Sequence, residues 1–307
     1  MKTKFQRIGL AKLCVWFGVT RQAFYKNSNS VASHAIEDEI VLQMVREIRS
    51  KHMKIGTRKL YSMIAPELAS HDIKMGRDGL FKLLTRNNLL IRKRKRRITT
   101  TYSSHWLRKY PNLIKGHIPI APNTLWVSDI TYWKINASEH FYISFITDAY
   151  SHKIVGHHVA NTLEAIESIQ ALKNALSALG AESIFQLTHH SDRGIQYCSS
   201  SYVKLLEKHD INISMTENGD PLENALAERI NGIIKDEYLE NHEVKNLKEA
   251  KKLLDIVVDL YNNERPHMSI SNLTPNVIHH SKDIVETKRL WKNYYQKKHT
   301  FVNQIQD

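Results

Sequence analysis

The chain has few cysteines and no long apolar run, and both absences narrow its possible classes. Two cysteines among 307 residues, Cys14 and Cys198, exclude a disulfide framework and any zinc site that needs several thiolates. We expect both to be reduced, as in a cytosolic compartment. No stretch approaches the ~20 apolar residues of a membrane span, and we expect no signal peptide. The 17 histidines form no Cys/His cluster with the spacing of zinc ligands.

Acidic residues are scarce in the first part of the chain. Residues 1–120 hold 25 Lys or Arg against 7 Asp or Glu, a net charge of +18, whereas residues 121–307 hold 19 against 24, a net charge of −5. The whole chain carries a formal charge of +13. An excess of this kind indicates a polyanionic partner, and nucleic acid is the usual one. The charge that attracts DNA therefore lies in the first part, while the second part is mildly acidic, as a metal-binding catalytic domain can be.

The first 36 residues have the pattern of a short helix-turn-helix. An apolar helical face ends at Gly18, and Thr20 can cap a second short helix that carries Arg21 and Gln22. In a helix-turn-helix the second helix enters the major groove, so Arg21 and Gln22 are candidate DNA contacts. An ordinary helical hairpin would show the same pattern.

Residues 37–91 repeat this theme at a larger scale. Apolar stripes predict a helix after residue 38, a second that begins at Gly56-Thr57, and a third that begins at Arg77. We interpret the segment as a helical DNA-binding domain in which Arg77 contacts DNA, although a helical bundle with another role fits the pattern too.

Residues 92–120 read as a basic linker. It opens with six consecutive basic residues, which repel one another and bind phosphates well: Arg92, Lys93, Arg94, Lys95, Arg96 and Arg97. Because the run follows a predicted DNA-binding domain, we favour phosphate contact over a solvated linker whose charge is incidental.

After residue 121 the pattern changes to an α/β domain that ends near residue 280. Aromatic and β-branched runs predict strands at 125–132, 141–147, 153–159, 184–190 and 211–215. Helices are predicted at 162–179, 202–209 and 222–239. Three strands joined by short turns, followed by strands reached through helices, give a mixed five-stranded sheet with flanking helices, the layout of the ribonuclease-H-like fold. The tail, residues 281–307, is predicted to be helical.

Three acidic residues stand out in this domain. Asp129 lies in the first strand among apolar neighbours, Asp192 directly follows the fourth strand, and Glu228 lies inside the long helix. The first and fourth strands are neighbours at the centre of this fold, so the two aspartates should lie side by side with the helix supplying the glutamate. Mg²⁺ prefers such hard oxygen ligands, and two ions can activate an attacking oxygen and stabilise a leaving one. Individually, each acid could instead be a surface charge, a turn residue or solvated helix.

Two basic residues on the predicted long helix are further candidate DNA contacts. Lys235 is seven residues from Glu228 and so lies on the same helical face, and Arg229 is adjacent to Glu228. Both suit contact with the DNA backbone, although Lys235 could be an ordinary solvated lysine. His189 and His190 closely precede Asp192; either both simply end a strand or, as the family resemblance described next implies, one of them contacts DNA or metal-bound water.

At these residues the chain resembles the DDE transposases of bacterial insertion sequences, of the retroviral-integrase superfamily. The resemblance rests on the segments WVSDITY, HSDRGIQY, ENALAERINGIIKDEY and YNNERPH, which recur in order, and on the 35 residues between Asp192 and Glu228. It covers about residues 38–280 and is closest to the second-frame protein, the catalytic half normally fused to a first-frame helix-turn-helix protein by ribosomal frameshifting. Met268, after Arg-Pro-His, is a departure at a variable position.

The resemblance implies a mechanism and partners. It implies that Asp129, Asp192 and Glu228 bind two Mg²⁺ or Mn²⁺ ions, that water cuts a transposon-end phosphodiester, and that the freed 3′-OH attacks another DNA phosphodiester. The expected partners are double-stranded DNA (transposon ends and target) and further copies of the chain on that DNA, with the first-frame protein as a candidate fusion partner and no membrane. The expected location is the bacterial cytoplasm, in association with the nucleoid.

Three other functions remain open from the sequence. A DNA-binding regulator without catalysis needs only the N-terminal part, but leaves the three acids unexplained. A ribonuclease-H-like nuclease would hydrolyse DNA without joining it. An inactive transposase copy could keep an intact sequence.

Overall fold

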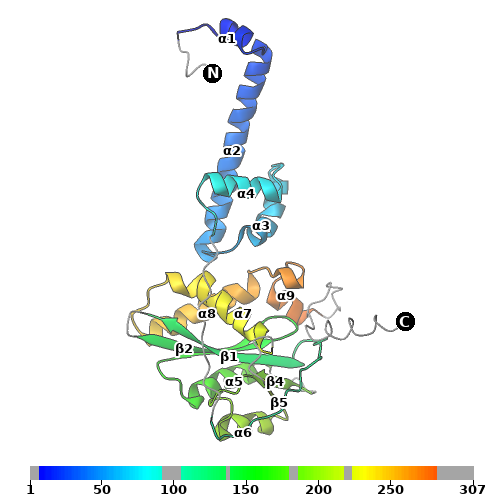
Figure 1. Ribbon diagram of the computed structural model, residues 1–307, viewed down its shortest axis with the longest axis vertical. Helices are drawn as coiled ribbons and strands as arrows, with labels where there is room; N and C mark the ends of the chain where they lie inside the picture. Colours follow the sequence, from blue (N-terminus) through cyan, green and yellow to red (C-terminus); the bar gives the residue numbers. More distant parts are fainter. Residues whose placement is uncertain (1–6, 92–104, 136–138, 180–185, 218–222, 282–307) are drawn as a thin grey trace, which may run out of the picture. The chain divides into compact units, whose positions relative to one another are not determined.

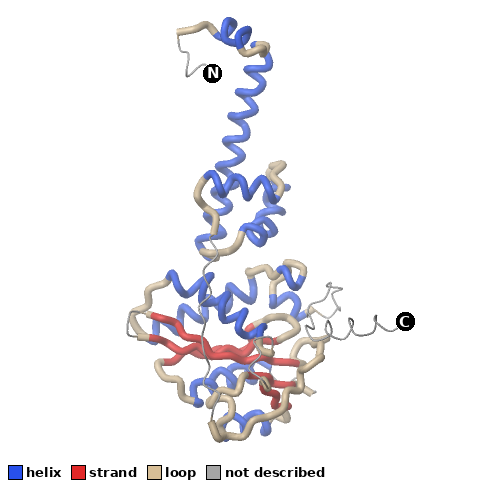
Figure 2. Tube along the Cα trace, viewed as in Figure 1, coloured by secondary structure: helices blue, strands red, loops and turns tan. Residues whose placement is uncertain are grey.

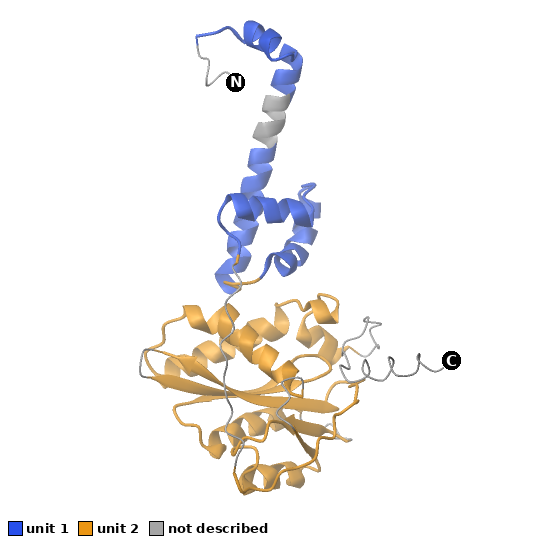
Figure 3. Cartoon of the chain, in the orientation of Figure 1, with its two compact units in different colours: residues 1–51, 56–90 blue, residues 52–55, 91–307 orange. Residues whose placement is uncertain are grey.

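A computed structural model describes residues 7–91, 105–135, 139–179, 186–217 and 223–281, except for the side chains of residues 27–33 (Figure 1). The chain forms two compact units (Figure 3). Unit 1 extends to Lys51 and continues from Gly56 to Leu90, and unit 2 contains residues 52–55 and the chain from residue 91 onward. None of the described helices has both the length and the apolar composition needed to cross a lipid bilayer.

Unit 1 is helical, as predicted. Its described helices are α1 (Leu10–Trp16), α2 (Arg21–Lys51), α3 (Thr57–Ser70) and α4 (Arg77–Arg86). The last two begin where the sequence predicts, directly after Gly56 and Gly76 in extended backbone. The apolar stripes of α2, α3 and α4 meet in a small core that contains Val41, Met44, Val45, Leu60, Ile64, Leu80 and Leu84.

The predicted short helix after Thr20 is wrong in its length. Gly18 ends α1 in the left-handed region, with φ of 64°, and the Thr20 hydroxyl accepts from the Ala23 amide at 3.0 Å, both as expected. The helix that follows does not stop, because α2 continues for 31 residues and contains neither Gly nor Pro. The predicted boundary between residues 36 and 37 therefore falls inside α2.

Unit 2 is built on the predicted mixed sheet. Its strands are β1 (Leu125–Lys134), β2 (His140–Asp148), β3 (Ile154–Ala160), β4 (Thr188–Ser191) and β5 (Asn212–Met215). They pair in the order β3-β2-β1-β4-β5. The β1–β2 and β2–β3 pairs are antiparallel, and the β1–β4 and β4–β5 pairs are parallel. This order confirms the ribonuclease-H-like layout and places β1 beside β4.

Helices cover both faces of this sheet (Figure 2). On one face, α5 (Ala165–Leu179) and α6 (Ser200–Lys208) pack on a cluster that includes Trp126 and Ile146. On the other, α7 (Ala225–Ile233) and α8 (Leu247–Asn263) pack on a cluster that includes Trp133 and Phe145. The alternation of side chains along β1 and β2 produces these two cores. A short helix, α9 (Pro275–His280), follows α8.

The predicted long helix at 222–239 is not uniform. After α7 the chain forms a π-helical turn at Ile234–Tyr238 and a 3₁₀ turn at Leu239–Asn241. Gly232 weakens the α-helix at this point, and the wider turn allows both Ile234 and Tyr238 to be buried. Lys235 therefore lies in the π-turn rather than two regular turns after Glu228.

Part of the predicted linker, from residue 105 onward, belongs to the fold of unit 2. The basic run Arg92–Arg97 lies outside the described residues, as does the predicted tail from residue 282. From residue 105, however, the chain is part of unit 2, because Leu107 and Tyr110 pack on the α5–α6 core. The Pro111 carbonyl also accepts from the Met215 amide at 3.2 Å. This segment is not a linker.

Candidate active site

Asp129 and Asp192 lie at the same level on neighbouring strands. In the parallel β1–β4 pair, Ser128 is opposite Ser191, and each aspartate is the next residue. Neighbouring strands are about 4.8 Å apart, and residues at equal register point to the same face of a sheet. The two carboxylates are thus directed to the same side, the side that α7 covers.

The carboxyl group of Asp129 lies in an unfavourable environment for a negative charge. Burial raises its pKa to about 8, and the charges of Asp192 and Glu228 contribute in the same direction. Two hydrogen bonds oppose this shift: the Ile130 amide donates to Oδ1 at 2.9 Å and the Asn231 amide group donates to Oδ2 at 2.8 Å. A cation near these acids would remove the repulsion.

Asp192 is held in a tight turn directly after β4. The Gly194 amide donates to its Oδ1 at 2.9 Å. A Cβ on Gly194 would lie 2.9 Å from that oxygen and 3.2 Å from the Gln196 Oε1, so a larger residue would displace the carboxylate. The glycine that makes Asp192 look like an ordinary turn residue in the sequence is therefore what orients the carboxylate.

Glu228 is exposed in the first turn of α7, between two buried asparagines on the same helical face. Asn224, four residues before it, donates from Nδ2 to the Ser128 carbonyl at 3.0 Å. Asn231, three residues after it, donates to Asp129. These two hydrogen bonds fix the Glu228 turn against β1, beside the aspartates.

The donor chemistry of this cluster fits a divalent cation. Three carboxylates are hard ligands, and the amide oxygens of Asn224 and Asn231 are buried without a hydrogen-bond partner. Over the described part of the chain, however, no three His, Cys, Asp or Glu side chains lie close enough together to hold one ion. Asp129 and Asp192 form the better-assembled part, and Glu228 affects Asp129 through its charge.

His189 and His190 are buried in the sheet and have no exposed ring with which to contact DNA. They are 1% and 0% exposed. His189 Nε2 lies 2.7 Å from the Ser128 hydroxyl and 2.9 Å from the Tyr202 hydroxyl, and His190 Nδ1 lies 2.8 Å from the Ser214 hydroxyl. Burial lowers the pKa of His189 to about 3 and that of His190 to about 4, so both are neutral. Their burial favours the alternative that both histidines simply end the strand.

Comparisons with known proteins agree on one family. The integrase core domain family matches residues 119–221 and, in a second segment, 209–275. A 31 kDa protein of insertion element IS600 of Shigella sonnei is 31% identical over 274 residues, which covers 86% of this chain and 96% of the relative. A putative transposase for insertion sequence element IS986/IS6110 of Mycobacterium tuberculosis is 30% identical over 225 residues, or 72% of this chain and 79% of the relative. The chain belongs to the insertion-sequence transposases.

Among solved structures, the magnesium-bound catalytic core domain of HTLV-2 integrase matches 52% of this transposase and 99% of its own length, with a TM-score of 0.42 and 22% identity. The integrase core match and the transposase relatives, rather than this likeness, make the transposase a member of the retroviral-integrase superfamily of enzymes that cut nucleic acid.

The predicted DNA contacts of the transposase are divided between its units. Arg21 and Gln22 are exposed at the start of α2, and Arg77 is exposed at the start of α4, where it pairs with Asp78 at 2.9 Å. Of the predicted contacts that the structure describes, Arg229 and Lys235 share unit 2 with the acids, Arg229 exposed on α7 and Lys235 half-buried in the π-turn.

The structure also shows residues whose part the sequence did not reveal. Asn224 and Asn231 could have been found from their spacing of four and three residues from Glu228, which places all three on one helical face. Arg265, in the YNNERPH segment, gives no such signal. It is 1% exposed, binds both oxygens of Glu237 at 2.8 and 2.7 Å, and donates to His267 Nε2 at 2.9 Å.

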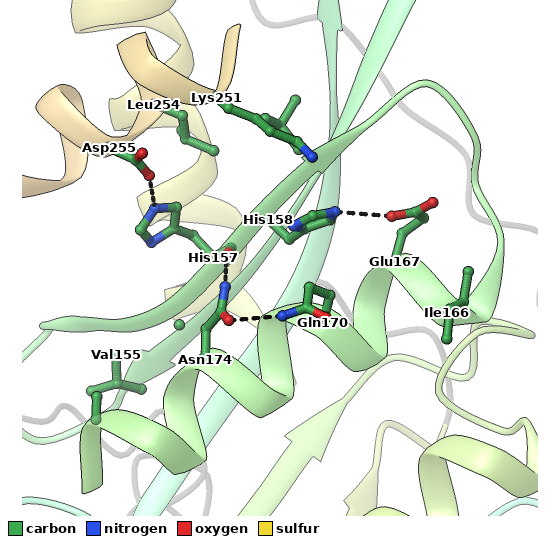
Figure 4. A pocket seen from close by; sticks show the side chains of 13 residues that line it. Val155, His157, His158, Ile166, Glu167, Gln170, Asn174, Lys251, Leu254 and Asp255 are labelled. Carbon is green, nitrogen blue, oxygen red and sulfur yellow. Dashed lines mark hydrogen bonds and ion pairs between the residues drawn. The ribbon is translucent and has the colours of Figure 1, made fainter. Parts of the chain in front are cut away.

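A hollow of about 800 Å³ lies at the β3 edge of the sheet, between α5 and α8 (Figure 4). Two histidine–carboxylate pairs border it, His157 with Asp255 and His158 with Glu167, each at 2.9 Å. None of its lining residues is one of the three acids, and β2 separates β3 from β1. The hollow is therefore not part of the candidate active site.

Proposed function

We propose that this transposase cuts DNA at the ends of its element and joins the freed 3′-OH to new DNA, with Asp129, Asp192 and Glu228 as the metal-binding acids. The observation that carries the proposal is that Asp129, in β1, and Asp192, directly after β4, each follow a residue of the Ser128–Ser191 pair, while the charge of Glu228 on α7 contributes to the raised pKa of Asp129. A like-charged cluster held in place by hydrogen bonds is costly for the fold and useful to a metal-dependent enzyme.

The proposed chemistry consists of a phosphodiester hydrolysis followed by a transesterification. In the first, water attacks the phosphorus at the element end and the 3′-oxygen leaves as a 3′-OH; in the second, that 3′-OH attacks a target phosphodiester and displaces its 3′-oxygen. Two bound Mg²⁺ or Mn²⁺ ions would supply activation of the attacking oxygen and stabilisation of the leaving one. No covalent bond to the protein forms.

The chain's own residues would orient this exchange. Asn231 donates to one oxygen of Asp129 and the Ile130 amide to the other, which fixes the plane of that carboxylate. Gly194 fixes Asp192 in the same way. Arg229 and Lys235, on the helical segment that carries Glu228, are placed to bind the phosphates that flank the reacting one.

Recognition and assembly complete the proposal. The exposed helix starts at Arg21, Gln22 and Arg77 would read the element ends, and the run Arg92–Arg97 would bind phosphates without reading sequence. The enzyme would act as a homo-oligomer on DNA, with a first-frame protein as a fusion partner, in the bacterial cytoplasm at the nucleoid.

The test is a strand-transfer assay with the full chain, Mn²⁺, and a duplex that carries the inverted repeats flanking the gene. Joined products are expected for the native chain, and none for Glu228→Gln. Glu243→Gln, an exposed glutamate beyond the π-turn, is the matched control and should join DNA normally. Cleavage without joining would instead identify a hydrolytic nuclease, and DNA binding without cleavage by the native chain would identify a regulator or an inactive copy.

A further inference from the structure

Residues 105–114, which we name the strap, connect the edge of the sheet to the loop of the second acid. At one end, His105 Nε2 lies 2.7 Å from the carbonyl of Arg193, the residue after Asp192. Farther along, the Leu113 amide donates to the Ser214 hydroxyl of β5 at 2.9 Å. Because both ends are hydrogen-bonded to unit 2, the strap has a defined position beside the candidate active site.

One aromatic side chain of the strap points away from the protein. Trp106 is 91% exposed, although its neighbour Leu107 packs on the α5–α6 core and His105 is bonded to the Asp192 loop. An indole is among the side chains that gain most from burial, so this exposure stabilises nothing in the fold. A rigidly anchored, solvent-facing indole is a flat surface on which a ring of another molecule can stack.

Two basic residues follow this indole in the strap. Arg108 and Lys109 are exposed, and the Arg108 guanidinium lies over the Tyr110 ring at 5.0 Å from its centre. The pKa of the Cys198 thiol is raised by burial and by Asp192 and lowered by Lys109 and Arg193. Asp192, Lys109 and Arg193 are therefore all near this one thiol, which places the charge of the strap beside the second acid.

An aromatic surface with flanking cations is the combination that binds single-stranded DNA. Stacking accepts any base, and the cations bind the phosphates on either side. We propose that the strap binds an unpaired DNA end, with a base stacked on Trp106 and the adjacent backbone held by Arg108 and Lys109. The inference rests on the proposed function, since a strand end at this place would be the end that is cut and joined.

The test compares the affinity of the full chain for two probes in EDTA, where no metal-dependent chemistry occurs. One probe is a blunt duplex and the other is the same duplex with mismatched, unpaired bases at one end. The native chain should bind the unpaired end about tenfold more tightly, the factor that one stacked base supplies. Trp106→Ala should abolish this preference, and Trp106→Phe, which keeps a ring, should retain most of it.

Two controls make the result specific. Trp16→Ala removes another exposed indole, 59% exposed on α1, and should leave the preference unchanged. Arg108→Gln with Lys109→Gln should weaken both probes alike and flatten the salt dependence, because phosphate contacts ignore base pairing. Because Trp106 is exposed, its variants should have the same melting temperature as the native chain, which thermal denaturation followed by circular dichroism measures.

A Trp106→Ala chain that kept the full preference for unpaired ends would overturn the inference, as would an equal loss of affinity for both probes. Neither result would bear on the three acids, because the assay contains no metal and forms no product. Conversely, failure of the strand-transfer assay with an intact end preference would reject the proposed chemistry and leave the strap as a DNA-end site.

Discussion

Two polar clusters of unit 2 each include a glutamate of the segment from α7 to the π-turn, and they differ in how their charges are balanced. Beside the start of α7, Asp129, Asp192 and Glu228 are all acidic, and burial together with the charges of the other two acids raises the pKa of Asp129 to about 8. At the π-turn that follows, Arg265 and Glu237 form a part-buried pair of opposite charges with two short hydrogen bonds. We expect the first cluster to lower the stability of the fold unless it binds a cation, and the second to need no ligand.

The balance of charge distinguishes residues expected to take part in the chemistry from residues that stabilise the fold. A buried pair whose donors and acceptors are matched needs no ligand, so Arg265 and Glu237 are explained by the packing of α8 against the π-turn. A cluster with excess negative charge and two amide oxygens without partners is incomplete as it stands. Substitutions in the two clusters should therefore differ in their effects on activity, on stability and on metal affinity.

The largest expected difference is in catalysis. Asp192→Asn should lower DNA end cleavage by about 10³-fold or more, because a metal site supplies several kcal/mol to the reaction. DNA affinity should stay near native, since the change removes a charge and little volume. Single-turnover cleavage in Mn²⁺ measures the rate. Asp236→Asn, an exposed acid of the π-turn, should cleave normally. Near-native cleavage by the Asp192 variant would remove it from the metal site.

Substitutions in the second cluster, Arg265 and Glu237, should change the stability of the fold. Arg265→Met should lower the free energy of unfolding by about 3 kcal/mol, because it removes both charge-assisted hydrogen bonds between the buried Arg265 guanidinium and Glu237. Adding Glu237→Gln should recover part of that loss. Urea denaturation measures both. Arg86→Met breaks an exposed pair with Asp38 and should cost less than about 0.5 kcal/mol. An Arg265→Met chain as stable as native would mean that the pair contributes nothing to the fold.

The Asp129 carboxyl should make stability depend on pH in the absence of metal. Its folded pKa, about 8, exceeds the unfolded value near 3.8, so the folded state disfavours the ionised form. The resulting loss of stability is absent below about pH 4, grows as the pH rises to about 8, and is constant above. Asp129→Asn in EDTA should thus be more stable than native by about 2 kcal/mol at pH 8, after allowance for solvent screening, and equally stable at pH 4. A difference independent of pH would contradict this.

The smallest effect concerns the hydrogen bond that orients Asp129. Asn231→Ala removes its donor and should weaken Mn²⁺ binding about tenfold, the usual cost of losing a partner that orients a metal ligand. Isothermal titration measures the affinity. Asn174→Ala, on α5 beside the hollow, removes an exposed asparagine and serves as the control. Equal affinities for the native and Asn231 chains would show that the bond serves packing alone.

Local patterns were enough to predict the sheet. The strands around Asp129 are long enough to show their apolar runs, and the element order places β1 beside β4 without further information. The helix after Thr20 is longer than predicted, because its 31 residues contain no Gly or Pro that would end it.

Contacts between distant residues could not be predicted. The strap reads as a linker because its partners lie far along the chain, 88 residues in the case of His105 and Arg193. Arg265 and Glu237 are 28 residues apart in segments of different structure, so no periodicity relates them. Such pairs are set by how the elements pack and not by local sequence.

The central claim is that three acids form a divalent metal site, and counting bound ions tests it most directly. Manganese titration of the full chain, followed by electron paramagnetic resonance, reports free Mn²⁺ and hence the number bound. The account predicts two ions for the native chain, and fewer or more weakly bound ions for each of Asp129→Asn, Asp192→Asn and Glu228→Gln. A chain with all three substitutions that bound Mn²⁺ as the native chain does would contradict it.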